Sequence, residues 1–282
     1  METGTADEAG SQAHALAEGN TLTQARAPHQ NTHSQKHKQG KRQGKEQSGV
    51  PGVSIEDGRM VMRVGGVIQS VKVDERYTPD VWDAMLPRRR PVNALILGLG
   101  GGTIATLMTR RWGALPIVGV ERDPQVVTLA RREFGLNALP NLHIVTDDAF
   151  AFVRRSARFL RSSRARQAAH RRRQDDSGEC DAGDKSTPQS MIHKASTDVY
   201  ILCEPCDVVC VDLYTAGKMA HGVLSGAFLS DVASLLAPDG EILLNLWQSS
   251  YLEDHLRRIR KALTIGELVL VDDNVIVHGK PA

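Results

Sequence analysis

Three acidic residues each follow an apolar run that predicts a buried β-strand: Glu121, Asp148 and Asp212. Because the carboxyl ends of parallel strands meet at one edge of a sheet, we expect the three carboxylates to face one crevice. Glu121 can accept hydrogen bonds from both hydroxyls of a ribose, and Asp148 can accept one from the amino group of an adenine. Asp212 lies among apolar residues, which predicts a raised pKa and a role as general base toward an attacking amine. Taken singly, each acid is also explained as a helix cap or a loop brace.

A glycine-rich turn is the second chemical signal. Gly98, Gly100 and Gly102 belong to the run Gly-Leu-Gly-Gly-Gly-Thr, which follows an apolar strand and precedes a predicted helix. Backbone N–H groups without neighbouring Cβ atoms let a ligand approach closely, so we expect this turn to contact the same nucleoside. Two alternatives stay open. A dinucleotide-binding dehydrogenase would have a third glycine where Thr103 stands, and a tight turn without any ligand has the same composition.

The elements that must position these residues alternate between strand and helix after residue 90. Strands are predicted at 94–99, 116–121, 142–147, 207–213, 241–247, 267–271 and 274–278. Helices are predicted at 103–112, 124–134, 221–236 and 250–263, with a shorter one near 79–85. Mostly continuous apolar strands indicate a sheet that is covered on both faces. The predicted fold class is α/β: an open, doubly wound, mostly parallel seven-stranded sheet that ends in an antiparallel hairpin at one edge.

Composition divides the chain into three parts. Residues 1–50 contain no Phe, Trp, Tyr, Ile or Cys, which predicts a disordered tail. Residues 51–90 alternate apolar and polar side chains around two Gly-containing turns, which predicts a small N-terminal β meander and a linking helix. Residues 91–282 form the predicted nucleoside-cofactor domain. An Arg-rich insertion interrupts it at about 154–198: a helix extends past Phe152, and no clear strand pattern returns until about Val199.

Five segments of this domain together resemble the spermidine synthase-like (polyamine aminopropyltransferase-like) family, which has the class I S-adenosylmethionine-dependent transferase fold, a Rossmann-like methyltransferase fold. The segments are 94–103, 118–126, 148–152, 207–213 and 236–242. The resemblance implies a transferase of polyamine biosynthesis that moves an aminopropyl group from decarboxylated S-adenosylmethionine to a small amine such as putrescine. It implies that Gln69, the Gly98–Gly102 turn, Glu121 and Asp148 hold the nucleoside, and that Asp212 accepts the proton.

The chain departs from the family pattern at acidic positions. Polyamine synthases have an Asp in the glycine-rich turn where this chain has Gly101, and a second Asp where it has Thr215. Without an acid at 101, discrimination against the carboxylate of ordinary S-adenosylmethionine is relaxed, so a methyltransferase is the alternative function. In that case Asp212 and Tyr214 would orient the acceptor. Aminopropyl transfer instead predicts that Asp80 or Asp83 supplies a missing anionic contact to the amine.

The Arg-rich segment Arg154–Arg173 supports a third possibility. Nine arginines in twenty residues make a strong local field, and a weak contact with RNA or another polyanion through it is the second alternative function, with the fold then non-catalytic. A solvated helix balanced by the acids that follow is the simpler interpretation.

The remaining features exclude several classes. The cysteines (Cys180, Cys203, Cys206 and Cys210) do not form a clear set of four metal ligands, so no metal is predicted. No apolar run approaches 18 residues, and no apolar signal segment follows Met1, so we expect a cytoplasmic protein without a membrane span. A homodimer is left open.

Overall fold

A parallel sheet forms the centre of the molecule. The computed structural model describes residues 22–24, 49–177, 191–196, 199–215 and 217–282, with side-chain surroundings left out for 22–24 and 171–177. Five strands of the main sheet are parallel to one another: β5 (Ala94–Leu97), β6 (Ile117–Glu121), β7 (Leu142–Thr146), β10 (Cys206–Val211) and β13 (Leu236–Trp247). Their side chains are largely buried, as continuous apolar strands require.

An antiparallel hairpin continues the sheet. It consists of β14 (Leu263–Val271) and β15 (Asn274–Pro281), and β15 lies between β13 and β14. The strand order is β14-β15-β13-β10-β5-β6-β7, which confirms the predicted seven strands. The three-residue strand β1 (Leu22–Gln24) adds an eighth by pairing in parallel with β14. The disordered tail predicted for residues 1–50 did not include this strand. Nearly all other residues of the predicted tail lie outside the described residues.

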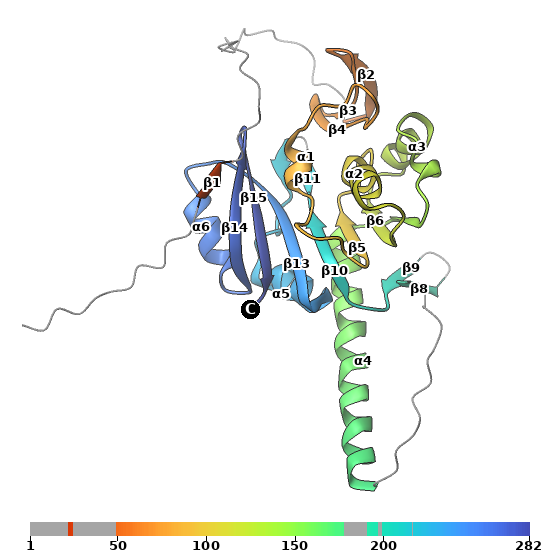
Figure 1. Cartoon of the computed structure of the whole chain (residues 1–282), viewed down its shortest axis with the longest axis vertical. Helices are drawn as coiled ribbons and strands as arrows, with labels where there is room; N and C mark the ends of the chain where they lie inside the picture. Colours follow the sequence, from red (N-terminus) through yellow and green to blue (C-terminus); the bar gives the residue numbers. More distant parts are fainter. Residues whose placement is uncertain (1–21, 25–48, 178–190, 197–198, 216) are drawn as a thin grey trace, which may run out of the picture.

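Helices cover both faces of the sheet (Figure 1). One face packs against α1 (Val81–Ala84), α2 (Thr103–Trp112), α3 (Pro124–Glu133) and the 3-10 helix η1 (Leu136–Ala138). The other face packs against α4 (Ala149–Ser177), α5 (Gly226–Leu235) and α6 (Leu252–Ile259). On β5, Ala94 and Ile96 belong to the first layer and Leu95 and Leu97 to the second, because successive strand residues point to opposite faces. The doubly wound α/β prediction is therefore confirmed.

A three-stranded meander precedes the sheet. It contains β2 (Gly52–Glu56), β3 (Arg59–Val64) and β4 (Val67–Val71), all antiparallel. Two buried hydroxyl groups connect β4 to the glycine-rich turn: the Thr103 hydroxyl donates to the Val71 carbonyl at 2.8 Å, and the Ser70 hydroxyl accepts from the Gly101 N–H at 2.6 Å. The meander is thus bonded directly to the glycine-rich turn after β5.

The Arg-rich segment is one long helix followed by a hairpin. Helix α4 extends well beyond the sheet (Figure 1). Arg161 pairs with Asp231 at 2.8 Å, and Arg164 donates to the Ser234 carbonyl at 3.1 Å and to the Leu236 carbonyl at 3.2 Å, so both guanidinium groups bind the last turn of α5. The prediction of no strand before Val199 is wrong, because β8 (Ile192–Ser196) pairs with β9 (Val199–Leu202).

Several element ends differ from the predictions for local reasons. Helix α5 begins at Gly226 rather than at residue 221, because the Ser225 side chain accepts from the Phe228 N–H and caps the helix. Strand β14 begins at Leu263, where helix 250–263 was predicted to end, because its pairing with β15 continues past an irregularity near Gly266. A small pair, β11 (Tyr214–Thr215) and β12 (Lys218–Met219), follows β10. No helix within the described residues is long and apolar enough to cross a membrane.

Candidate active site

A pocket opens at the carboxyl ends of β5, β6, β7 and β10. It is lined by Val64, Gln69, Gly98, Gly100, Val120, Glu121, Arg122, Asp123, Val126, Asp147, Asp148, Ala149, Phe150, Asp212, Leu213, Tyr214, Thr215 and Ala220. Most of the residues predicted to bind ligand therefore come together here, including all three strand-end acids. Five of the lining side chains are carboxylic and one is a guanidinium, so the pocket favours a cationic ligand.

Gly98 lines this pocket where the turn after β5 meets the end of β10. Its φ of +87° lies in the left-handed region, and a Cβ there would lie 2.1 Å from the carbonyl oxygen of Asp212. Only glycine lets the turn after β5 approach the end of β10 so closely. The glycine thus brings the glycine-rich turn and the candidate base to one place.

Glu121 is held in place by two backbone groups. Its carboxylate accepts the N–H of Gly100 at 3.0 Å through one oxygen and the N–H of Asp123 at 3.1 Å through the other. Each carboxylate oxygen has a second lone pair, so the group can still accept ribose hydroxyls from the pocket. Asp148 is exposed, and its side chain accepts the Ala151 N–H at 2.9 Å in the first turn of α4.

Asp212 receives one hydrogen bond on each oxygen. The indole N–H of Trp82 donates to Oδ2 at 3.3 Å, and the amide of Asn245 donates to Oδ1 at 3.0 Å. Burial raises the pKa of the Asp212 carboxyl, and the bonds from Asn245 and Trp82 lower it in part. A carboxylate whose pKa is raised is a stronger proton acceptor than an exposed aspartate.

Tyr214 stands beside this carboxyl. Its hydroxyl donates to the Asn245 carbonyl at 3.3 Å, and burial followed by the charge of Asp212 raises the pKa of the phenol. The tyrosine therefore stays neutral and forms part of the pocket wall around Asp212.

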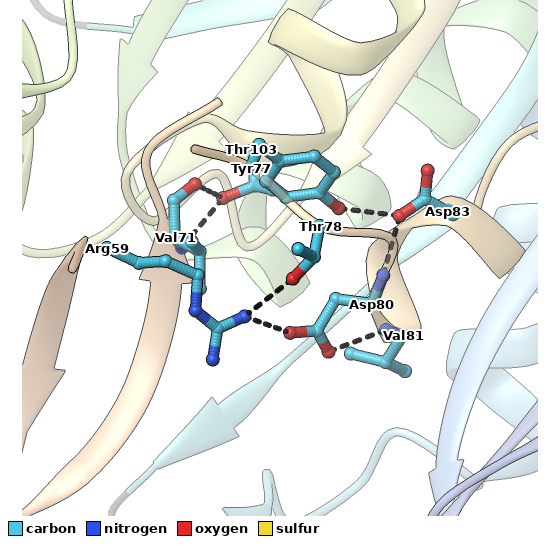
Figure 2. Close-up of polar contacts among 8 residues, drawn as sticks. All are labelled: Arg59, Val71, Tyr77, Thr78, Asp80, Val81, Asp83 and Thr103. Atoms are coloured by element: carbon cyan, nitrogen blue, oxygen red, sulfur yellow. Dashed lines mark hydrogen bonds and ion pairs between the residues drawn. The ribbon is translucent and has the colours of Figure 1, made fainter. Parts of the chain in front are cut away.

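Two residues predicted for the site do not line the pocket. Gly102 caps α2 with φ +78°, and a Cβ there would lie 2.3 Å from Leu136. Asp83 accepts the Tyr77 hydroxyl at 2.6 Å and the Asp80 N–H at 2.8 Å, as Figure 2 shows. Asp80 accepts the Val81 N–H at 2.7 Å, so both acids cap α1. A substrate contact by Asp83 stays a prediction.

Gly101 and Thr215 stand where polyamine synthases have acidic residues, and the structure shows the surroundings of both. A Cβ on Gly101 would lie 2.7 Å from the Cβ of Ser70 and 3.0 Å from a ring atom of Phe134, so a larger residue does not fit without movement of β4 or α3. The hydroxyl of Thr215 accepts from Arg122 at 3.3 Å, across the mouth of the pocket. Neither position offers an acid to a bound amine.

Sequence reasoning missed the roles of Trp82 and Asn245, which contact Asp212 from α1 and β13. They lie 130 and 33 residues from Asp212 along the chain, so no local pattern connects them. The one available signal was an amide and an indole in otherwise apolar surroundings, since such groups need partners when buried.

The cysteines lie away from this chemistry. Cys206 and Cys210 are fully buried free thiols, and burial raises the pKa of both; Cys203 is half-buried. Cys180 lies outside the described residues. Among the residues that the structure describes, no three His, Cys, Asp or Glu side chains are grouped so that they could hold a metal ion.

Known proteins resemble this chain in part. No protein-family model matches it. Over 99 residues it is 37% identical to the polyamine aminopropyltransferase of Mycobacterium tuberculosis, a match that covers 33% of this chain and 18% of that protein. The chain thus spans about a fifth of the length of the curated relatives it matches, which include the polyamine aminopropyltransferase of Mycobacterium bovis.

Solved structures extend the likeness to most of the chain. A probable spermidine synthase from Corynebacterium glutamicum is 15% identical, with a TM-score of 0.54 over 82% of this chain and 76% of that one. Human methyltransferase-like protein 13 in complex with SAH is 18% identical, with a TM-score of 0.48 over 72% of this chain and 79% of that one. The first of these shows that the chain has the same fold as that probable spermidine synthase, as the resemblance implied.

Proposed function

We propose that this chain, which has the spermidine synthase-like fold, transfers an aminopropyl group from decarboxylated S-adenosylmethionine to a small amine such as putrescine. The observation that carries the proposal is the setting of Asp212: a half-buried carboxyl with a raised pKa, in the same pocket as Glu121 and Asp148. The 37% sequence identity to a polyamine aminopropyltransferase over 99 residues supports the choice of reaction.

The residues present fit a nucleoside of this kind. Gly98 and Gly100 present backbone to the pocket, Glu121 offers carboxylate oxygens to a ribose, and Gln69 and Asp148 lie on the pocket wall. When bound, the co-substrate supplies a sulfonium whose adjacent propyl carbon is electrophilic. The protein supplies orientation, which lowers the barrier by removing translational and rotational freedom from the reactants.

Asp212 accepts the proton that the amine releases in this reaction. The amine nitrogen attacks the carbon next to the sulfonium, a C–N bond forms, the C–S bond breaks, and methylthioadenosine leaves. The amine gives one proton to the Asp212 carboxylate, which Trp82 and Asn245 hold in a fixed orientation. A positioned general base contributes about 10²-fold to 10⁴-fold in rate.

The test is Asp212→Asn. We expect it to lower kcat by at least about 100-fold while calorimetry shows little change in nucleoside binding. Asp272→Asn is the matched control, because Asp272 is exposed in the β14–β15 turn at φ +49°, where Asn is tolerated. Full activity of Asp212→Asn would contradict the assignment of the base.

Methyl transfer is the second candidate, and Gly101 favours it. No acid stands at this position to attract the amine of decarboxylated S-adenosylmethionine or to repel the carboxylate of the ordinary form. Parallel calorimetric titrations with the two ligands separate the reactions. A preference of about tenfold for the decarboxylated form, about 1.4 kcal/mol, supports aminopropyl transfer, and the reverse preference supports methyl transfer.

We also propose a weak polyanion contact on α4. Arg154 and Arg158 are exposed there, whereas Arg155, Arg161 and Arg164 already bond to groups of this chain. This contact would add to the transferase activity rather than replace it. The homodimer stays a prediction.

A further inference from the structure

Helix α1 contains a single turn, yet it carries the indole that bonds to Asp212. A helix of four residues has too few internal hydrogen bonds to hold its own position, so its placement must come from its neighbours. Trp82 is 8% exposed, and its N–H reaches Asp212 Oδ2 at 3.3 Å. Whatever fixes α1 therefore also fixes one of the two donors to the candidate base.

The start of α1 is fixed by the meander. Asp80 and Asp83 form a reciprocal cap at its first turn, and the Tyr77 hydroxyl donates to Asp83 at 2.6 Å. Arg59 of β3 donates to Asp80 at 3.5 Å and to the Thr78 hydroxyl at 3.4 Å (Figure 2). These bonds connect the N-terminal end of α1 to the antiparallel meander.

The end of α1 is fixed by the last strand of the sheet. His278 of β15 is 5% exposed, and its ring nitrogens lie 3.1 Å from the Ala84 carbonyl and 2.8 Å from Glu241 Oε1. The Ala84 carbonyl and the Glu241 carboxylate are both acceptors, so each contact is a hydrogen bond when the ring nitrogen that faces it carries a proton. From β10, the Cys210 thiol lies 3.5 Å from the Met85 carbonyl, at the C-terminal end of α1. The imidazole thus joins the last turn of α1 to a carboxylate of β13.

We propose that His278, oriented by Glu241, is a positioning residue for Asp212: it fixes the last turn of α1 so that Trp82 keeps its hydrogen bond to the carboxyl. His278 does not line the pocket, so it acts only through the helix. The role of Asp212 in this statement rests on the proposed function, but the mechanical link from His278 to Trp82 does not.

Strand β13 contributes to the same carboxyl by two routes. Glu241 and Asn245 are four residues apart on this strand, so both side chains point to the face that α1 covers. Asn245 donates directly to Asp212, and Glu241 orients the imidazole that fixes α1. One strand thereby aligns both donors to the candidate base.

The experiment compares His278→Leu with His278→Gln. Leucine fills the space but cannot donate to Ala84, whereas the amide N–H of glutamine can. The control is Val277→Ala, because Val277 is buried on the opposite face of the same strand and its truncation destabilises the fold without touching α1.

The first readout does not depend on turnover. The chain has three tryptophans, so Trp112→Phe with Trp247→Phe leaves Trp82 as its only tryptophan, and selective excitation of tryptophan makes it the reporter of the surroundings of Asp212. In this background we expect His278→Leu to shift the Trp82 emission and increase its quenching by acrylamide at least about twofold, and His278→Gln to restore most of the original signal. Equal effects of His278→Leu and Val277→Ala would overturn the proposal.

The second readout is the pH dependence of kcat. Burial, and after it the charge of Asp212, raises the pKa of Tyr214; burial, then the charges of Glu241 and Asp212, raises that of Cys210. Glu121, Asp123, Asp147 and Asp148 also line the pocket, so the part of the acid limb that disappears in Asp212→Asn is the part that reports Asp212. Loss of the Trp82 bond removes one effect that lowers the pKa of Asp212, so the acid limb moves to higher pH and kcat falls about tenfold, with KM for the nucleoside unchanged. If the unmodified protein binds nucleoside but shows no turnover, the proposed function fails while the fluorescence result still decides this inference.

Discussion

At Asp212, burial and hydrogen bonding act in opposite directions on one carboxyl. Burial raises its pKa, and two donors from distant elements limit the increase. Without the donors the carboxyl would remain protonated over more of the pH range, and it could not accept a proton there. The site therefore depends on Trp82 and Asn245 as much as on the acid itself.

Trp82→Phe tests this balance at the level of one bond. Phenylalanine keeps an aromatic ring in the buried space but removes the N–H, so the pKa of Asp212 rises further. Because the ionised form is the proposed base, we expect activity to be lost first at low pH, with kcat/KM falling about threefold to tenfold on the acid side and less on the alkaline side. The pH profile of kcat/KM measures this change.

Trp112→Phe is the control for this substitution, since Trp112 lies at the end of α2, away from the pocket. It should leave the profile in place. An unchanged acid limb in Trp82→Phe would mean that the indole bond does not influence the base.

Gly98→Ala tests the close approach of the turn to β10. Its Cβ would lie 2.1 Å from a backbone oxygen of Asp212, which no rotamer change relieves. We expect a loss of more than about 3 kcal/mol in the free energy of unfolding, or failure to fold, measured by urea denaturation. Gly135→Ala is the matched control: its φ is +76° and nothing lies within 4 Å of its Cβ position, so it should cost about 1 kcal/mol. Similar losses at both glycines would show that contact with Asp212 contributes nothing.

At the scale of the elements, α4 and the β8–β9 hairpin are joined by one buried hydroxyl. Ser156 is completely buried, and its Oγ accepts the Leu202 N–H at 2.9 Å. Ser156→Ala leaves that backbone N–H without its partner, so we expect it to cost about 1–3 kcal/mol in the free energy of unfolding and to accelerate hydrogen exchange at Leu202. Ser162→Ala, at an exposed position of the same helix, should change neither. Slow exchange at Leu202 in the Ser156 variant would contradict this account.

Elements with strong local signals were predictable. Helix α2 has the predicted bounds Thr103–Trp112, since a glycine turn precedes it and Gly113 ends it. Strand β8 was missed because its sequence has neither an apolar run nor an alternation of apolar and polar residues. Four of its five residues are exposed, and only Ile192 is partly buried. Strand β1 was missed because three residues in polar surroundings are too few to make a pattern.

The residues of the candidate site also fall into those that the sequence predicted and those that it did not. Its acids at strand ends were predictable, because the topology of a parallel sheet gathers those positions at one edge. Asp83 shows the limit: the sequence did not indicate that its carboxylate caps α1, and its substrate contact stays a prediction. Trp82 and Asn245 depend on contacts between α1, β10 and β13, which only the folded chain brings together.

At the scale of the whole molecule, charge is distributed unevenly around a small net value. The formal net charge is +2, yet nine arginines occur within residues 154–173 and five acids line the pocket. The pocket and the protruding part of α4 therefore attract ligands of opposite sign. Under the proposed function we therefore expect a cationic amine at the first and a polyanion at the second.

Binding of a single-stranded RNA oligonucleotide measures the contribution of α4. Each phosphate contact adds about 0.7 to the slope of log affinity against log salt, so Arg154→Ala with Arg158→Ala should reduce that slope by about 1.4 in fluorescence anisotropy titrations. Both side chains are exposed, so we expect no loss of folding or of transferase activity. Arg131→Ala with Arg132→Ala removes the same charge from α3 and should leave the slope nearly unchanged. An equal reduction in both pairs would attribute the binding to net charge alone, and the helix would then serve only to hold α5 through Arg161 and Arg164.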